Sequence, residues 1–529
     1  MWNVKLDGTR YDDISLINTI LKNRNITDTY SFLNPSSEDL LPLTDLKNIQ
    51  SAANIVKQGL QKHKKFKIFF DVDNDGVMSG TIMYDYLRHF TDKLSWTVNI
   101  GKKHGVIEDN MKNYLDTDIL IIVDSLNRNM KLYQEILKHG IDIIILDHHM
   151  IPKEIDTKTL HLVSSANDYK NPQLSGSGVV WKFCCYLDKV FNTNYAYNLC
   201  DLAASGIISD MCDVSDKSIE NRYICDYGFN HVTNTGLKQI NGHYAFNSQS
   251  ISFGIAPLIN ASCRFNKNTD AVSLMLSNDK KEINAYIKQL KSYKTKQKKI
   301  VDNMMPNILR QVKKQKAHKF LCAFISDNCN MSGLIANKLL GIYKVPILIL
   351  HEENNIYKGS ARGIGVESFK TIVEQTQACK TAGHENAFGI EIQKSDFKQF
   401  IQKLVKLLND ITFVNKYDID VQLTPQRITP MLIDRLKAVN RITGEGFKPI
   451  NVAIKDISNY EVKTMSNGKH LKICSRDMDF IKWNYTGDIN ALIIYHPILE
   501  FVGTLDSNYF GGMYSKQLII NDFKEQEGG

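Results

Sequence analysis

Acidic residues and histidines follow three short apolar runs in the first third of the chain. KIFF at 67–70 precedes Asp71, Asp73 and Asp75, ILIIV at 119–123 precedes Asp124, and IIIL at 143–146 precedes Asp147, His148 and His149. Carboxylates packed together repel one another strongly unless a cation lies among them. If the three runs are neighbouring strands, their ends therefore predict a site for divalent cations.

The mixture of carboxylates and imidazoles limits which ions fit. It suits Mn²⁺ or Mg²⁺ better than structural zinc. Two such ions about 3.5 to 4 Å apart would serve phosphoester hydrolysis. A calcium loop at 71–82 is excluded, because its twelfth position is Ile82 rather than Glu. For Asp147, His148 and His149 taken alone, a solvated turn is the alternative.

The three apolar runs lie in a stretch whose elements alternate. Helical-looking segments at 81–90 and 129–140 separate the runs, and strand–helix–strand alternation predicts a parallel α/β sheet. In open sheets of this kind, ligands bind beyond the carboxyl ends of the strands. The expected fold thus collects the acidic residues and histidines at one edge of the sheet.

Three further regions follow this stretch. Apolar residues recur at helical spacing from Asp279 to Met304, with Pro306 just beyond, which predicts a connecting helix of about 26 residues. A second, smaller α/β domain is predicted after it. Five segments, at 449–457, 468–476, 479–488, 491–497 and 515–523, predict the short strands of an OB-type β-barrel. We therefore expect domains at 1–275, 307–415 and 416–529, with the connecting helix at 276–306.

Composition narrows the class of protein. The chain has 529 residues, enough for several domains, and its 43% hydrophobic content is ordinary for a globular protein. Its ten cysteines include no C-x-x-C pair, and we find neither a signal peptide nor an apolar run of about 18 residues, so we expect a soluble cytoplasmic protein with no membrane partner. The net charge of +8 permits a polyanionic partner without requiring one, and each lysine-rich segment alone is more often a solvated face.

Four segments together resemble the successive motifs of the DHH phosphoesterase superfamily: DVDNDG at 71–76, VDS at 123–125, LDHH at 146–149 and ASGIISD at 204–210. Over nearly its whole length the chain resembles the RecJ-type single-strand DNA exonucleases. This narrower likeness is carried by FGIAPLINASCRF at 253–265, KGSARGIG at 358–365, AGHENAFGI at 382–390 and SNYFGG at 507–512. The resemblance implies an α/β fold in which a parallel-sheet DHH domain is joined by a long helix to a smaller α/β DHH-associated domain, with a C-terminal OB domain.

The resemblance also implies roles for individual residues. Two divalent cations, Mn²⁺ or Mg²⁺, would be bound by Asp73, Asp75, Asp124, His148 and Asp210, with Asp124 bridging them. Catalytic neighbours that orient ligands or contact the scissile phosphate would be Asp71, Asp147 and His149. Ser360 and Arg362 would hold the 5′-terminal phosphate. Further contacts with nucleic acid would come from Asn260, Arg264, Lys103 and His384.

The chain departs from the family pattern at several places. Lys102 or Lys103 replaces an arginine upstream of the second motif, which keeps the charge and loses the bidentate fork. The glycine usual soon after the second-motif aspartate is absent, since Ser125 and Leu126 follow it. Asn328 replaces a histidine, and Gly363 replaces a serine. None of these changes removes a metal ligand, but they leave the strength of 5′-phosphate recognition open.

The OB segment also carries aromatic residues. Candidates for stacking on bases are Trp483, Tyr485, Tyr509 and Phe510. For each of them, packing in the barrel core is the alternative.

The expected function is a metal-dependent exonuclease, specific for single-stranded DNA, that works from 5′ to 3′ and releases 5′-mononucleotides in DNA repair or recombination. We expect a monomer that binds the 5′ end of single-stranded DNA, with a single-strand-binding protein or a helicase as candidate partner. One alternative is a DHH enzyme for small substrates, an oligoribonuclease or a cyclic-dinucleotide phosphodiesterase, which would not need residues 420–529. Another is a non-enzymatic replication scaffold that kept the fold.

Overall fold

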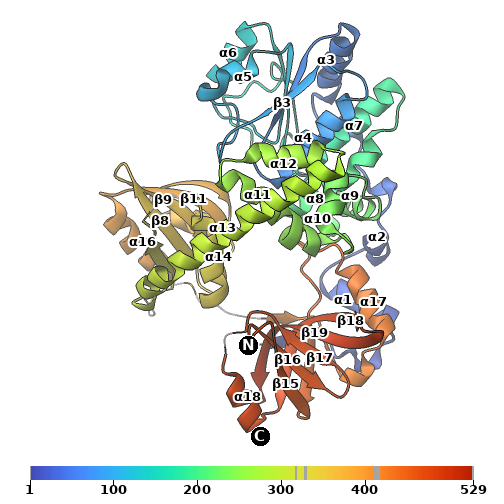
Figure 1. Ribbon diagram of the computed structural model, residues 1–529, viewed down its shortest axis with the longest axis vertical. Coiled ribbons are helices and arrows are strands. Elements are labelled where there is room, and N and C mark those ends of the chain that lie inside the picture. The colour runs from blue at the N-terminus through green and yellow to red at the C-terminus, as the bar shows by residue number, and fades with distance from the viewer. Residues whose placement is uncertain are drawn as a thin grey trace. The chain divides into compact units, whose positions relative to one another are not determined.

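The structure is a computed structural model, and it describes residues 2–315, 319–326, 330–409, 411, 417–485 and 487–526, without the side chains of Tyr417 and Phe510. The chain forms two compact units. The larger unit contains residues 2–263, 267–287 and 417–529, and the smaller unit contains residues 264–266 and 288–416. Figure 1 shows the helices and strands of both units.

A five-stranded parallel sheet forms the centre of the first part of the larger unit, in the order β3-β2-β4-β5-β6. Its strands are β2 (Phe66–Phe70), β3 (Leu94–Val98), β4 (Ile119–Val123), β5 (Asp142–Asp147) and β6 (Leu162–Ser164). Every residue of β2 and β4 is buried, as expected for strands covered on both faces. The predicted parallel α/β sheet is confirmed.

Helices cover both faces of this sheet (Figure 1). On one face, Tyr114 of α5 (Met111–Tyr114) and Tyr133 of α6 (Met130–Lys138) pack against Leu120 and Ile122 of β4. The other helices of this part are α3 (Ile49–Gln61), α4 (Asn74–Leu87), α7 (Gly176–Phe191), α8 (Cys200–Ser209), α9 (Ile219–Asn230), α10 (Thr235–Asn241), α11 (Ala256–Arg264) and α12 (Asn268–Leu276). Helix α4 connects β2 to β3 and packs against α7 and α8, so the residues after β2 enter a helix that is buried on several sides.

The N-terminal arm of the chain packs against its C-terminal region. Strand β1 (Trp2–Val4) pairs in parallel with β12 (Tyr417–Ile419). Helices α1 (Asp13–Asn23) and α2 (Thr29–Leu33) follow it. Arg24 makes a bidentate ion pair with Asp420, with both N–O distances at 2.7 Å. The two ends of the sequence therefore belong to one folded unit.

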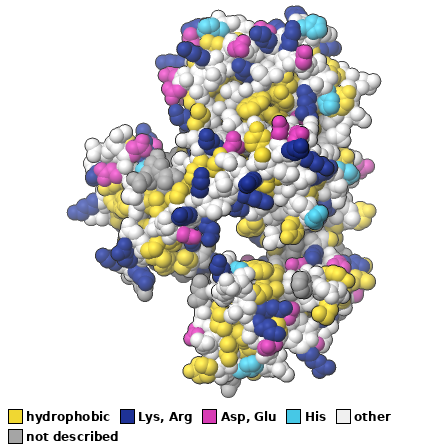
Figure 2. Space-filling model, viewed as in Figure 1, with side chains coloured by type: hydrophobic (Ala, Val, Ile, Leu, Met, Phe, Trp, Pro, Cys, Tyr) yellow, Lys and Arg dark blue, Asp and Glu magenta, His cyan; other side chains and the backbone are white. Residues whose placement is uncertain are grey.

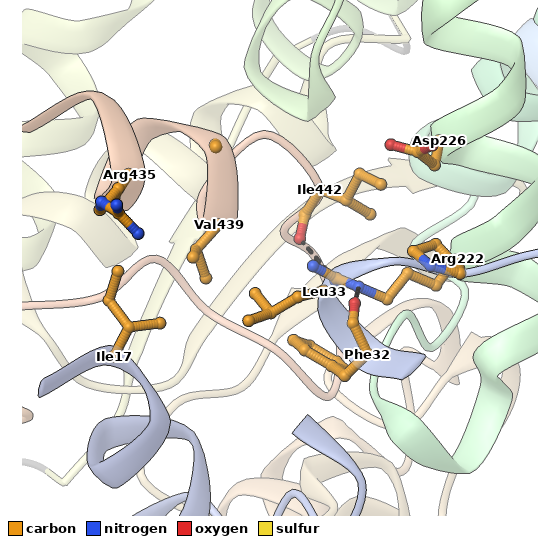
Figure 3. Close-up of a pocket in the computed structure, with 10 residues that line it drawn as sticks. Ile17, Phe32, Leu33, Arg222, Asp226, Arg435, Val439 and Ile442 are labelled. Carbon is orange, nitrogen blue, oxygen red and sulfur yellow. Dashed lines mark hydrogen bonds between the residues drawn. The ribbon is translucent and has the colours of Figure 1, made fainter. Parts of the chain in front are cut away.

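A buried arginine joins three parts of the larger unit. Arg222 of α9 is 3% exposed, and its guanidinium donates hydrogen bonds to the carbonyl oxygens of Phe32 at 2.7 Å and Ile442 at 3.1 Å. Its guanidinium carbon lies 3.7 Å from the centre of the Phe32 ring. Figure 3 shows these contacts at the edge of a pocket of about 200 Å³ that Arg435 also lines. Arg222 therefore holds the N-terminal arm and the segment after α17 (Pro430–Val439) against α9.

The C-terminal part of the larger unit is a seven-stranded, mainly antiparallel, OB-like sheet in the order β13-β14-β18-β19-β17-β16-β15. Its strands are β13 (Val421–Leu423), β14 (Val452–Ile457), β15 (Tyr460–Met465), β16 (His470–Ser475), β17 (Asp479–Lys482), β18 (Leu499–Phe510) and β19 (Met513–Glu525). The strand predicted at 491–497 is wrong, because these residues lie in or just after helix α18 (Ile489–Tyr495). The Asp488 side chain caps this helix, and only Leu492 of its apolar residues is buried.

The connecting helix is longer than the sequence predicted. Helix α13 (Lys280–Lys313) has 34 residues and continues through Pro306. Proline costs a helix one backbone hydrogen bond. Here that loss is offset by packing, because Val301, Met305, Ile308 and Val312 on both sides of Pro306 are buried in one apolar cluster. Lysine and arginine side chains lie along the exposed surface of α13 in Figure 2.

The smaller unit is built on a mixed five-stranded sheet in the order β10-β11-β9-β8-β7. Its strands are β7 (Leu321–Phe324), β8 (Ile347–Glu353), β9 (Ile356–Arg362), β10 (Lys380–His384) and β11 (Ala387–Gln393). Only β7 and β8 pair in parallel. Helices α14 (Ser332–Tyr343), α15 (Phe369–Glu374) and α16 (Phe397–Asn409) complete the predicted second α/β domain.

Among the helices of the described residues, none has the length and apolar character needed to cross a membrane.

Candidate metal centre

The predicted acidic and histidine residues meet at one edge of the parallel sheet. Asp71 directly follows β2, Asp124 follows β4, and Asp147 is the last residue of β5. Neighbouring parallel strands bring these ends together. His148 lies among them, with Nε2 3.2 Å from Oδ1 of Asp124 and 3.5 Å from Oδ2 of Asp210.

Three overlapping sets of side chains each present ligand atoms within 4.8 Å of one another. These sets are Asp71, Asp73 and Asp124; Asp75, His148 and Asp210; and Asp124, Asp147, His148 and His149. Asp124 and His148 each belong to two sets. All five predicted metal ligands therefore lie in one cluster, which is large enough to offer two neighbouring positions for ions.

The start of α4 fixes the first group of carboxylates. Asp73 is the N-cap of α4, and its side chain accepts a hydrogen bond from the Gly76 backbone N–H at 3.1 Å. Gly76 is required, because a Cβ there would lie 2.3 Å from Cβ of Asp71. Asn74 then links α4 to the end of α8 by donating to Oγ of Ser209 at 2.9 Å.

The other ligands lie on α8 and at a strained turn. Asp210 is the C-cap of α8, and Gly206 one turn earlier leaves room for Asp75, since a Cβ there would lie 1.9 Å from Oδ1 of Asp75. Asp124 has a φ angle of 54°, in the left-handed region that residues other than glycine seldom adopt. Such strain concentrates at functional sites, where the surrounding structure holds it in place.

The charges and unpaired acceptors of this cluster are suited to a bound cation. Asp75 Oδ2 and Asp124 Oδ1 are buried and accept no hydrogen bond within the described residues, although His148 lies near Asp124. Burial and the neighbouring Asp75 raise the pKa of Asp124 well above its usual value. Burial, Asp75 and Asp73 raise the pKa of Asp210 to about 8, and burial and Asp71 raise that of Asp73 to about 6. These oxygen atoms fit divalent cations, which would satisfy the unpaired acceptors and remove the repulsion.

Asp147 and His149 form a dyad at the edge of the cluster. Nδ1 of His149 lies 2.7 Å from Oδ1 of Asp147, which also accepts the His149 backbone N–H at 2.8 Å. Asp147 raises the pKa of His149 to about 10. Burial opposes ionisation of Asp147, but His149 and the other donors lower its pKa overall. The His149 side chain is 57% exposed, so this imidazole can reach a substrate.

A further imidazole, which the sequence did not predict, lies at this site. Nδ1 of His104 lies 2.7 Å from Oδ2 of Asp71. Ser125 donates to the other oxygen of Asp71 and accepts the Gly105 backbone N–H at 2.7 Å, which gives a structural role to a departure from the family pattern. Lys103, which we predicted to contact nucleic acid, forms an exposed ion pair with Asp109 at 2.9 Å. The only signal for His104 was its position directly after the two lysines that we considered.

A second group of candidate residues lies at the start of α14 in the smaller unit. Oγ of Ser360 lies 2.8 Å from Oγ of Ser332, and Arg362 donates to Asn337 at 2.8 Å. A Cβ on Gly333 would lie 2.9 Å from Nη2 of Arg362. Burial, and then Arg264, lower the pKa of Arg362. Two guanidiniums, two hydroxyls and the N-terminus of a 12-residue helix without a side-chain cap make a site suited to an anion.

Four other positions singled out in the sequence remain. Asn260 lies on α11, and its Oδ1 is buried without a hydrogen bond in the described structure. His384 ends β10. At Gly363 a Cβ would lie 2.2 Å from Oδ1 of Asn386, so the serine usual in the family has no room there. Asn328 lies outside the described residues.

The aromatic candidates of the OB region differ in exposure. Trp483 is 49% exposed and Tyr509 is 74% exposed, so core packing is wrong for both. Tyr485 is partly buried beside Phe523, with ring centres 6.0 Å apart. The side chain of Phe510 lies outside the described part of the chain.

Comparisons with known proteins agree with this architecture. The model of the DHH family N-terminal domain matches residues 65–207, and that of the RecJ OB domain matches residues 419–522. A putative SPbeta prophage-derived single-strand DNA-specific exonuclease, YorK, from Bacillus subtilis is 26% identical over 96% of this chain and 95% of its own length. The single-stranded-DNA-specific exonuclease RecJ of the same species is 25% identical over 93% of this chain and 65% of its own length.

Solved structures show the same fold. The structure of RecJ in complex with Mn²⁺ from Thermus thermophilus has a TM-score of 0.80 and 20% identity, and the match covers all of this chain and 80% of that one. A structure of exonuclease RecJ bound to manganese has a TM-score of 0.57 and 22% identity, over 71% of this chain and 97% of that one. The chain thus carries a match to the DHH N-terminal domain and a match to the RecJ OB domain, and over nearly its whole length it is similar to RecJ-type exonucleases.

Proposed function

We propose that this protein is a metal-dependent exonuclease specific for single-stranded DNA, which works from 5′ to 3′ and releases 5′-mononucleotides. The observation that carries the proposal is the convergence of Asp73, Asp75, Asp124, His148 and Asp210, from four separate parts of the chain, on one buried cluster. Relatives that match 93% or more of this chain are named as single-strand DNA-specific exonucleases.

The five clustered ligands would hold two divalent cations, Mn²⁺ or Mg²⁺, which supply Lewis-acid activation of water and phosphate when bound. Asp124 is the ligand proposed to serve both ions. The protein's own contribution to the chemistry includes the Asp147–His149 dyad. Asp147 holds Nδ1 of His149, and the exposed ring can donate to a phosphate oxygen as negative charge develops there.

We assign the polarity to the anion site of the smaller unit. Ser360, Ser332 and Arg362, together with the start of α14, would bind the terminal 5′-phosphate. Asn260, Arg264, His384 and Lys103 remain proposed contacts with nucleic acid. We further propose stacking of bases on the exposed rings of Trp483 and Tyr509 in the OB region.

We propose one role for each of the expected segments. Residues 1–275 would hold the metals, 276–306 would connect, 307–415 would bind the DNA end, and 416–529 would bind the strand farther along. We place the protein in the cytoplasm as a monomer that acts in DNA repair or recombination, with a single-strand-binding protein or a helicase as candidate partner.

The test is digestion of 5′-labelled and 3′-labelled single- and double-stranded DNA with Mn²⁺ or with Mg²⁺, reading the size of the first product. We expect mononucleotides from the 5′ end of single strands and little attack on duplex. Dinucleotides as the only hydrolysed substrate would favour the small-substrate alternative instead. Failure to hydrolyse any phosphodiester with either ion would favour a non-enzymatic scaffold.

A further inference from the structure

One imidazole at the metal centre has no part in the function proposed above. The side chain of His104 is 59% exposed, while its partner Asp71 is buried and 2% exposed. Nδ1 of His104 lies 2.7 Å from Oδ2 of Asp71. Because Nδ1 is occupied by this carboxylate, Nε2 on the opposite side of the ring is the nitrogen left to meet a substrate.

His104 repeats the arrangement of His149. Each imidazole is more than half exposed, and each is held through Nδ1, at 2.7 Å, by a buried aspartate: Asp71 for His104 and Asp147 for His149. The metal centre thus has two imidazoles whose Nδ1 is bound by a buried aspartate and whose other side is exposed. His149 belongs to the family motif, and His104 does not.

The two imidazoles reach the carboxylates from different loops. His104 lies in the loop after β3, and His149 follows β5. The loop of His104 crosses the end of β2, since the Gly105 backbone N–H donates to Ser125 after β4. A phosphate bound over the carboxylate cluster would therefore face two imidazoles that are each anchored by an aspartate.

The loop that carries His104 is held in place. Asn99 donates hydrogen bonds to the carbonyl oxygens of Lys103 at 2.9 Å and Gly105 at 2.7 Å, one on each side of His104. The Gly105 backbone N–H donates to Ser125 at 2.7 Å. Catalysis benefits from side chains fixed in this way before the substrate binds. Lys103 is directed to Asp109, so His104 is the member of this loop with a described contact to the cluster.

We propose that His104 is a catalytic residue whose Nε2 donates a hydrogen bond to an oxygen of the scissile phosphate. The inference rests on the proposed nuclease function. A ring that donates to Asp71 through Nδ1 and to phosphate through Nε2 carries both protons, so the contact adds positive charge where negative charge develops. The competing explanation is that His104 only orients Asp71.

The experiment compares His104→Ala and His104→Gln with the wild-type protein on a 5′-phosphorylated single strand in Mn²⁺. We expect kcat to fall about 10²-fold in both variants. We expect Mn²⁺ affinity, measured by calorimetry, to stay within about twofold of wild type, and the melting temperature to stay unchanged because the side chain is exposed. Added imidazole should restore part of the activity of His104→Ala and none to His104→Gln, whose side chain fills the space.

Three outcomes would overturn the inference. An unchanged kcat would remove His104 from the chemistry, and a loss of Mn²⁺ affinity as large as the loss of kcat would make it a positioning residue for Asp71. A larger effect from Lys103→Ala than from His104→Ala would indicate that Lys103, rather than His104, contacts the phosphate. His139→Ala, which removes an exposed imidazole at the end of α6, is the matched control and should behave as wild type. An inactive wild-type protein would instead contradict the proposed function itself.

Discussion

Nε2 of His148 lies 3.2 Å from Oδ1 of Asp124, although the two residues follow different strands of the parallel sheet. The same nitrogen lies 3.5 Å from Oδ2 of Asp210, which ends a helix later in the chain. An imidazole between two carboxylates, with further acidic side chains next to them, is a geometry that metal ions stabilise.

Replacing the shared ligand should stop hydrolysis without preventing DNA binding. Asp124→Asn keeps the size of the side chain but removes the charge that the proposed ions require. We expect nuclease activity to fall at least about 10²-fold while the Kd for single-stranded DNA changes little. Asp156→Asn, at an exposed turn, is the matched control. Substantial activity in Asp124→Asn would exclude this residue as a metal ligand.

Metal binding should depend on pH in a defined direction. Without metal, burial and neighbouring carboxylates raise the pKa of Asp210 to about 8 and that of Asp73 to about 6. The folded protein then holds protons that the unfolded chain releases above about pH 4, so its stability falls as pH rises from about 4 toward 8. A cation displaces these protons, and its stabilising effect should therefore grow over the same range.

Thermal unfolding with and without Mn²⁺ measures this effect. We expect the increase in Tm caused by Mn²⁺ to be larger at pH 8.5 than at pH 6, because the ligands bind metal only when deprotonated. Other buried acids affect both samples equally, so the difference between them isolates the metal centre. An equal increase at the two pH values would contradict the assignment of Asp210 and Asp73 as ligands.

The anion site of the smaller unit should distinguish the ends of a strand. Arg362→Ala removes one guanidinium beside Ser360 and the start of α14, and a hydrogen bond to a charged group contributes about 1.5–3 kcal/mol. We expect kcat/KM to fall about 10- to 100-fold for strands with a 5′-phosphate and much less for strands with a 5′-hydroxyl. Lys394→Ala removes an exposed cation of the same unit and is the control. Equal losses on both kinds of end would argue against an end pocket.

The buried arginine should contribute to stability rather than to activity. Arg222→Met would leave the carbonyl oxygens of Phe32 and Ile442 without their donor, and each unsatisfied buried acceptor costs about 1–3 kcal/mol. We expect the free energy of unfolding in urea to fall by about 3 kcal/mol. Arg435→Met, in the wall of the same pocket but partly exposed, should change it by less than about 0.5 kcal/mol. Similar losses in the two variants would mean that the carbonyl contacts contribute little.

The parallel sheet and its ligand edge were predictable because their signal is local. Apolar runs such as Ile143–Leu146 are followed at once by the residues that the strand positions, so periodicity and chemistry coincide. His104 gave no such signal. It lies in a loop without apolar pattern, and its contact with Asp71 depends on the crossover that places β3 beside β2.

Two predictions of secondary structure were wrong, each for a different reason. The segment 491–497 is apolar at nearly every position, so its sequence does not distinguish a strand from a helix, and the Asp488 cap decides for the helix. A proline normally marks the end of a helix. Helix α13 continues through Pro306 because Val301 and Ile308, on either side of it, pack against apolar residues later in the chain. In both places, tertiary packing or a single cap outweighs local preference.

The pairing of β1 with β12, together with the Arg24–Asp420 ion pair, has a consequence for how the chain is made. Residues 2–4 and Arg24 find their partners only after residues 417–420, far later in the sequence, have been translated. Until then the arm has nothing to pair with, and a chain truncated before residue 417 would expose the surfaces that it covers. Loss of function on such truncation would therefore report incomplete folding as well as loss of the OB region.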